Sequence, residues 1–274
     1  MIQLILILTI IIDLAVIFSL IYVLILARPS AKPPKSDALL CDYAHRGLHG
    51  DSIPENSLAA FKLARDKGFA IELDVHLSAD KEVMVFHDAT LERMTGNPAK
   101  ISELTCAELQ KLTLAGTDEH IPTFREVLEL IDGNVPLLVE LKGENTDTSL
   151  CPEVAKLLRE YSGEYCIESF NPMLLSAMRK QIPDAYYGLL YTNVCREKNN
   201  RSLLNIALTG MALNVLARPN FIAFDYRDRD SFPVKLTTRF WRAPKFVWTI
   251  RSDDELEIAR QNGEYPIFEH CNKK

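Results

Sequence analysis

The chain has 274 residues, of which 47% are hydrophobic and 25% are charged, and its formal net charge at pH 7 is -6. With 11 glycines and 14 prolines it is neither collagen-like nor of low complexity, and its acidic balance argues against nucleic-acid binding through a broad basic surface. The six cysteines are far apart and form no CxxC pair, which excludes zinc-knuckle spacing and indicates buried free thiols in a reducing compartment.

The N-terminal segment is strongly apolar. Leu4–Leu26 carries a single charged residue, Asp13, and at about 1.5 Å per helical residue it can span a hydrocarbon layer of about 30 Å. No Lys or Arg precedes it, and it is longer than the apolar core of a cleaved signal peptide. We therefore expect residues 1–28 to form an uncleaved transmembrane anchor.

Three cations follow the apolar segment, and they predict its orientation. Arg28, Lys32 and Lys35 come directly after it, so the positive-inside rule predicts a cytoplasmic catalytic domain on a single-pass membrane protein. Residues 29–38 contain three prolines and are expected to form a short, stiff linker.

Short apolar runs alternate with helical patterns over the rest of the chain, residues 39–274. The expected strands are Leu39–Ala44, Phe69–Val75, Val83–His87, Val135–Leu141, Tyr165–Phe170, Tyr186–Leu190, Phe221–Phe224, Phe246–Ile250 and Pro266–Phe268. The expected helices are Leu58–Lys67, Thr123–Ile131, Pro152–Tyr161, Pro172–Lys180 and Asp253–Asn262. This alternation predicts a parallel sheet, and the first strand is followed by neither a Rossmann nor a P-loop glycine motif. A TIM (β/α)8 barrel is the favoured α/β fold, with one of the nine strands outside the barrel.

Ionisable residues gather at the ends of the first five expected strands. In chain order they are His45 and Arg46, Glu72 and Asp74, His87 and Asp88, Glu140 and Lys142, and Glu168. Burying so many charged groups is costly unless they pair or bind a cation. A barrel would bring them together at its C-terminal mouth, where the active sites of such barrels lie.

The residue types at this mouth point to phosphate-ester chemistry. The carboxylates of Glu72, Asp74 and Glu140 would form a hard oxygen site that suits Ca²⁺ or Mg²⁺. Two histidines can serve as acid and base, while Arg46 and Lys142 can hold an anion. A single strand-end carboxylate or histidine is more often structural, so the prediction depends on the whole set.

At these residues the sequence resembles the glycerophosphodiester phosphodiesterase family, in its bacterial form with an N-terminal membrane anchor. The similarity covers about Tyr43 to Glu269, and the order and spacing of its short motifs make it specific. The matching segments are 44–47 (AHRG), 54–57 (PENS), 72–75 (ELDV), 85–88 (VFHD), 91–96 (LERMTG), 121–124 (IPTF), 140–142 (ELK), 169–170 (SF) and 247–249 (VWT). The resemblance implies a TIM barrel with a small insertion after the third strand, at about residues 89–135.

The resemblance also implies three kinds of site residue: acid–base histidines, metal ligands, and groups that contact the phosphate or line the pocket. In that order they are His45 and His87; Glu72, Asp74 and Glu140; and Arg46, Lys142 and Trp248. The implied cofactor is one divalent cation, Ca²⁺ or Mg²⁺. The other histidines match nothing catalytic, and Glu55 and Asn56 are interpreted as shaping a loop. One departure lies near the C-terminus, where a typical family ending has Thr-Asp followed by Pro and this chain has residues 267–270 (IFEH). This removes a familiar Asp and leaves the role of the last strand's polar residue open.

The implied function is metal-dependent hydrolysis of a small glycerophosphodiester to sn-glycerol 3-phosphate and an alcohol, in glycerophospholipid metabolism. Two alternatives stay open. A lysophospholipase D-like enzyme acting on membrane lysolipids would use the same motifs, and a non-catalytic scaffold would keep only the fold. The intact histidines argue against the scaffold.

Overall fold

A computed structural model describes residues 1–50, 52–143 and 146–271. Within these residues, eight parallel strands close into a barrel, because β1 pairs with both β2 and β9. The barrel strands are β1 Tyr43–Ala44, β2 Ala70–Leu77, β4 Leu137–Leu141, β5 Tyr165–Ser169, β6 Tyr186–Tyr191, β7 Phe221–Asp225, β8 Lys245–Ile250 and β9 Tyr265–Phe268. The predicted TIM barrel is confirmed.

The strand outside the barrel is the third in the chain, β3 Val83–Val85, which pairs antiparallel with β2. Only residues 78–82 separate the two strands, and a connection this short makes a hairpin, whereas a parallel crossover needs a dozen or more residues. The sequence predicted one extra strand without saying which it is.

The segment after β3 has its own small apolar cluster, built around Phe86, Leu91 and Ile121. It contains the short helices α3 Glu92–Thr95 and α4 Cys106–Leu109. The next helix, α5 Phe124–Ile131, buries its apolar face in the main core. Within the expected insertion 89–135, the residues from 124 onward therefore pack with the barrel.

The five expected helices are present, with ends shifted by one or two residues. They are α2 Leu58–Asp66, α5, α6 Leu150–Glu160, α7 Pro172–Gln181 and α12 Asp253–Gln261. The sequence did not predict four short helices after β6 and β7, which are α8 Val194–Glu197, α9 Leu203–Thr209, α10 Asn214–Ala217 and α11 Phe232–Lys235. Segments of four to seven residues are too short to show a helical hydrophobic period.

The first barrel strand is shorter than expected. Leu39–Ala44 was predicted as a strand, but Asp37–Leu39 forms a 3-10 turn, which begins where the Ser36 hydroxyl accepts a hydrogen bond from the Ala38 amide. Only Tyr43 and Ala44 pair with the neighbouring strands, so the polar residues that follow them lie directly at the barrel mouth.

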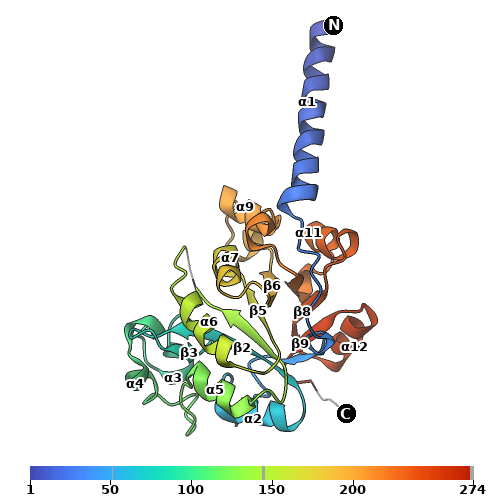
Figure 1. Cartoon of the computed structure of the whole chain (residues 1–274). Helices are drawn as coiled ribbons and strands as arrows, with labels where there is room; N and C mark the ends of the chain where they lie inside the picture. Colours follow the sequence, from blue (N-terminus) through green and yellow to red (C-terminus); the bar gives the residue numbers. More distant parts are fainter. Residues whose placement is uncertain (51, 144–145, 272–274) are drawn as a thin grey trace.

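The N-terminal helix α1 Ile2–Ile21 stands away from the barrel (Figure 1) and continues as a π-helical turn over Tyr22–Leu26. Ile2–Leu26 is long and apolar enough to cross a membrane, a test that an N-terminal signal sequence also passes. Its last turn is hydrogen-bonded to the barrel domain. The Tyr22 hydroxyl donates to the Gly210 carbonyl at 2.7 Å, and the Trp241 indole donates to the Val23 carbonyl at 3.1 Å.

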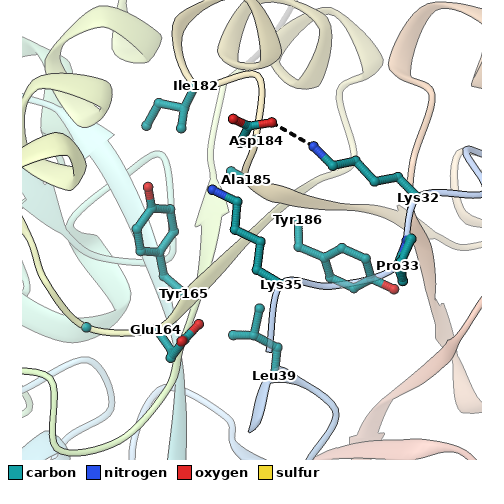
Figure 2. Close-up of a pocket in the computed structure, with 11 residues that line it drawn as sticks. Lys32, Pro33, Lys35, Leu39, Glu164, Tyr165, Ile182, Asp184, Ala185 and Tyr186 are labelled. Carbon is teal, nitrogen blue, oxygen red and sulfur yellow. Dashed lines mark hydrogen bonds and ion pairs between the residues drawn. The ribbon is translucent and has the colours of Figure 1, made fainter. Parts of the chain in front are cut away.

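The linker is packed along the barrel. The Ser30 amide donates to the Pro219 carbonyl, and the Asn220 amide nitrogen donates to the Lys32 carbonyl. Figure 2 shows the Lys32 ammonium reaching Asp184, at 2.8 Å, beside the N-terminal end of β6. The linker therefore crosses the end of the barrel opposite the mouth, above a small cavity of about 190 Å³.

Candidate active site

A pocket of about 170 Å³ opens at the carboxyl ends of the barrel strands. Seven of the eight predicted site residues line it, and the eighth, Asp74, forms ion pairs with two of them, Arg46 and Lys142. The predicted residues in the lining are His45, Arg46, Glu72, His87, Glu140, Lys142 and Trp248. The structure brings the predicted residues together at this pocket, and their assignment as catalytic, metal-binding and phosphate-binding residues stays a prediction.

The three carboxylates form the base of the site. Glu72 and Asp74 lie two residues apart on β2 and so face the same side, and Asp74 stands opposite Glu140 in the register of β2 and β4. One ligand oxygen from each of the three lies within 4.8 Å of the others, and all three residues are at most 7% exposed. A buried group of carboxylate oxygens is a donor set that fits a hard divalent cation.

The pKa values of the three carboxyl groups are shifted by burial and by the charges around them. Burial, together with repulsion by the neighbouring carboxylates, raises the pKa of Glu72. Burial likewise raises the pKa of Glu140 to about 7, although Lys142 opposes the shift. The Lys142 ammonium lies 2.9 Å from Asp74 and 2.7 Å from Glu140. Burial would raise the pKa of Asp74 too, but Lys142, His87 and Arg46 hold it below its usual range.

We expect the substitution Glu140→Gln to stabilise the metal-free protein more at pH 8 than at pH 5. The folded Glu140 carboxyl binds its proton more tightly than the unfolded one, so its contribution to stability is full below about pH 4.5 and is lost as the pH rises through about 7. The gap in melting temperature between variant and wild type should widen by roughly 3–10 °C over this range, measured with chelator present. The exposed substitution Glu129→Gln is the control. A gap that does not change with pH would contradict the raised pKa.

His45 directly follows β1 and is oriented by a residue that the sequence left without a role. Its Nδ1 lies 3.0 Å from Glu269, and because a carboxylate only accepts, Nδ1 carries the proton and donates. The other ring nitrogen, Nε2, lies 4.0 Å from Glu72. Burial lowers the pKa of His45 to about 4, despite the opposing bond to Glu269. The imidazole is therefore neutral at pH 7, with Nε2 as its acceptor.

Glu269 stands where the resemblance suggests a different residue, and it is the clearest positioning group that the sequence missed. Its carboxylate also meets His49 at 3.5 Å and Arg251 at 2.5 Å. These partners hold the pKa of Glu269 below its usual range against the effect of burial. His45, His49 and Glu269 are close enough to hold a metal, but the Arg251 guanidinium on the same carboxylate opposes a cation there.

His87 lies just beyond β3 and is oriented in the same way. Its Nδ1 donates to the Asp88 carboxylate at 2.5 Å, and Asp88 also accepts from Arg93 at 2.6 Å. Arg93 in turn binds Glu55, which binds Arg46 at 2.7 Å. Burial lowers the pKa of His87 as well. This chain of ion pairs runs from His87 to Arg46 through Asp88, Arg93 and Glu55. The loop-shaping role of Glu55 stays a prediction.

The backbone turn after β1 places Arg46. Arg46 has a φ of 53°, and its amide donates to Glu72 at 2.9 Å while its guanidinium Nε lies 3.4 Å from Asp74. Gly47 follows with a φ of 80°, and a Cβ at this position would come within 2.9 Å of Ala60. Glycine is therefore required for this turn to pack against α2.

Glu168 and Trp248 also line the pocket. Glu168, on β5 opposite Glu140, is buried, and its Oε2 has no hydrogen-bond partner in the described part of the chain. Burial and its carboxylate neighbours raise its pKa. The sequence placed it at a strand end but gave it no role. Trp248 donates its indole N–H to the Ala223 carbonyl and packs edge-on against Phe170.

The remaining histidines lie outside the pocket lining. His76 lies 3.1 Å from the His87 carbonyl, and His120 lies 3.7 Å from Glu126 on the surface. The rings of His49 and His270 pack against each other.

The fold and the pocket together describe a (β/α)8-barrel protein whose mouth is rich in carboxylates, histidines and cations. The model of the glycerophosphoryl diester phosphodiesterase family matches residues 45–268, and the chain belongs to this family. The family is one of phosphoric diester hydrolases.

Individual relatives agree with this assignment. A glycerophosphodiester phosphodiesterase of Caldanaerobacter subterraneus is 38% identical over 160 residues, 54% of this chain and 65% of the relative. A human lysophospholipase D is 35% identical over 135 residues, 44% of this chain and 42% of the relative. The chain thus spans between two fifths and two thirds of the length of these two relatives. An Oleispira antarctica phosphodiesterase, solved in complex with the product sn-glycerol-3-phosphate, shares the fold at 24% identity, with a TM-score of 0.69 over 84% of this chain and 92% of the other.

Proposed function

We propose that the chain hydrolyses glycerophosphodiesters to sn-glycerol 3-phosphate and an alcohol, as part of glycerophospholipid metabolism. One observation carries the proposal: three buried carboxylates, two carboxylate-oriented histidines and two cations converge on one pocket of about 170 Å³. The product bound to the Oleispira phosphodiesterase is consistent with a pocket of this size and charge.

The proposed mechanism assigns a task to each kind of side chain. Glu72, Asp74 and Glu140 would hold a Ca²⁺ or Mg²⁺ ion, which supplies Lewis-acid stabilisation of negative charge on the phosphate when bound. Arg46 and Lys142, which already lie against these carboxylates, bind the anionic phosphate through charge-assisted hydrogen bonds.

Proton transfer is assigned to Nε2 of His45 and of His87, because Nδ1 of each ring donates to a carboxylate. One histidine, in its neutral form, removes a proton from the attacking water or from a glycerol hydroxyl. The other must first take up a second proton at Nε2, which the negative charge of the bound phosphate favours, and it then gives this proton to the departing alcohol oxygen. Either order of the two histidines fits the geometry. Trp248 forms an apolar wall beside the reacting groups.

The proposal is tested by a substrate panel on the full-length protein in detergent. We expect release of sn-glycerol 3-phosphate from glycerophosphodiesters with ethanolamine, choline, glycerol or inositol headgroups in the presence of Mg²⁺ or Ca²⁺. No release from any of the four with either ion would contradict it.

We further propose the domain organisation expected from the sequence: an anchor over residues 1–28, a linker over 29–38 and a catalytic barrel over 39–274. The apolar N-terminal helix supports the anchor. Arg28, Lys32 and Lys35 support a cytoplasmic catalytic domain at the cell membrane. Protease added to intact cells should then leave the barrel uncut.

We expect the full chain to stay with membranes after carbonate extraction and to retain residue Met1, because an uncleaved apolar span resists release. Fractionation followed by mass spectrometry of the N-terminus measures both. The matched control carries Ile12→Lys and Val16→Lys, which place two charges in the middle of the span and should allow extraction. Recovery of a chain that begins downstream of the apolar segment would indicate a signal sequence instead.

A further inference from the structure

The side of the barrel domain that meets the N-terminal helix exposes apolar and aromatic side chains. They include Leu203 and Ile206 on α9, Phe232 on α11 and Phe240 shortly after it, which are between 51% and 88% exposed. The Tyr22 ring, in the last turn of the apolar span, stacks on Phe232 with the ring centroids 6.4 Å apart. Figure 1 shows α9 and α11 on either side of this last turn. Aromatic and apolar side chains beside a membrane span are typical of the level of the lipid headgroups.

A hollow of about 960 Å³ opens on the same side of the domain. We call it the anchor-side hollow, because Tyr22 forms part of its wall. Its lining combines the polar side chains of Arg196, Arg201 and Asn199 with the apolar ring of Phe232. Its volume lies within the range of about 300–1,000 Å³ that is usual for a small-molecule site.

The two arginines of the anchor-side hollow differ in their partners. Arg196 binds Asp228 at 2.6 Å and Glu197 at 3.0 Å, so its charge is balanced within the chain. Arg201 is exposed, and its guanidinium has no ion pair or hydrogen bond with any other residue that the structure describes. A guanidinium in this situation is available for an anion from outside the chain, and it matches the geometry of a phosphate.

The segment that carries α9 and α11 is basic, although the whole chain is acidic. Residues 192–242 contain nine Lys and Arg and four Asp and Glu, a net charge of +5, whereas the chain as a whole carries -6. Arg28, which directly follows the apolar span, lies over the Trp241 ring with its guanidinium carbon 4.7 Å from the centroid. The positive charge of the domain is therefore concentrated next to the span, where it complements an anionic lipid leaflet.

We propose that the anchor-side hollow binds the headgroup of an anionic phospholipid from the leaflet in which the N-terminal helix ends. Arg201 binds the lipid phosphate, while Phe232 and Ile206 lie against the first carbons of the acyl chains. The bound lipid holds the barrel against the leaflet in one orientation. This site is separate from the active-site pocket and does not depend on hydrolysis. It rests on the proposed anchor, which carbonate extraction tests independently.

The test measures lipid binding to the full chain by native mass spectrometry from a neutral detergent, after chelation to prevent turnover. Equal concentrations of 1-palmitoyl-2-oleoyl phosphatidylglycerol and of the matching phosphatidylcholine are added together. We expect at least about fivefold more bound phosphatidylglycerol, since one cation beside an anionic lipid contributes a factor of about this size. Raising the ionic strength from about 0.1 M to about 1 M should reduce the preference, because salt screens exposed charges.

Three variants locate the preference in the anchor-side hollow. Arg201→Glu should bring the ratio of the two bound lipids to within about twofold of one, while Arg201→Lys, which keeps the charge, should retain a preference. The matched control is Arg125→Glu on α5, far from α1 in Figure 1, which makes the same change of charge at a side chain that is 52% exposed. It should leave the lipid preference unchanged.

Equal binding of the two lipids by the wild type would overturn the proposal, as would equal losses of preference in Arg201→Glu and Arg125→Glu. Displacement of the bound phosphatidylglycerol by inorganic phosphate would identify a site for free phosphate and overturn the assignment to lipid. Melting temperature is measured on the same samples. If Arg201→Glu melts earlier than the wild type, Arg201→Gln replaces it, and a full preference in that variant overturns the proposal.

Discussion

His45→Ala and His87→Ala should each lower kcat by about 10²–10⁴-fold, the usual contribution of a positioned proton-transfer group. Both rings lie at the mouth with Nδ1 bound to a carboxylate and with a pKa that burial lowers, so that Nε2 of each ring is left for proton transfer. Steady-state kinetics on sn-glycero-3-phosphoethanolamine, with melting temperature measured on the same samples, provides the test.

His120→Ala is the matched control, because His120 lies on the surface against Glu126 and should leave kcat near that of the wild type. If the two mouth histidines were structural, their variants would lose melting temperature in step with activity. Folded variants with near-normal kcat would refute the acid–base assignment.

Loss of one of the three carboxylates, Glu72, Asp74 or Glu140, should damage activity as much as removal of the metal does. We expect Glu72→Gln and Asp74→Asn each to reduce turnover by at least about 100-fold, and chelation to abolish it. Each substitution removes both a charge and an anionic ligand from a site whose oxygens lie within 4.8 Å of one another. Calorimetric titration of Mg²⁺ and Ca²⁺ into the wild type and the variants separates lost affinity from lost chemistry.

Glu129→Gln, on the exposed face of α5, changes the same type of residue away from the mouth and should bind metal as the wild type does. Full activity after exhaustive chelation would remove the divalent cation from the mechanism. Unchanged metal affinity in both Glu72→Gln and Asp74→Asn would show that the ion binds elsewhere.

Much of the architecture was predictable because its causes are local. Alternating apolar strands and amphipathic helices such as α5 and α12 show their period in the sequence, and β/α alternation then favours a barrel. The extra strand β3 needed one more argument, the length of its connection to β2. Short helices such as α9 lack a full hydrophobic period, and their exposed leucines face outward beside the anchor instead of entering the core.

The part of the site that lies on the barrel strands was predictable from the sequence. Glu72, Asp74 and Glu140 follow from a period of two on neighbouring parallel strands. Residues that reach the site from segments far apart in the sequence show no such period. Glu269 meets His45 across 224 residues, and Arg93 meets Glu55 across 38, through contacts that only the closed barrel creates. The family motifs include both Glu55 and Arg93, but the motifs could not indicate that the two residues bind each other.

The most direct test of the hydrolytic assignment is the fate of oxygen from labelled water. The full chain is incubated with sn-glycero-3-phosphoethanolamine and Mg²⁺ or Ca²⁺ in H₂¹⁸O. The masses of the products are then measured by mass spectrometry. The proposed chemistry predicts one ¹⁸O atom in the phosphate of sn-glycerol 3-phosphate and none in ethanolamine, whichever group attacks phosphorus first. Label in the alcohol, or phosphoethanolamine and free glycerol as products, would contradict it.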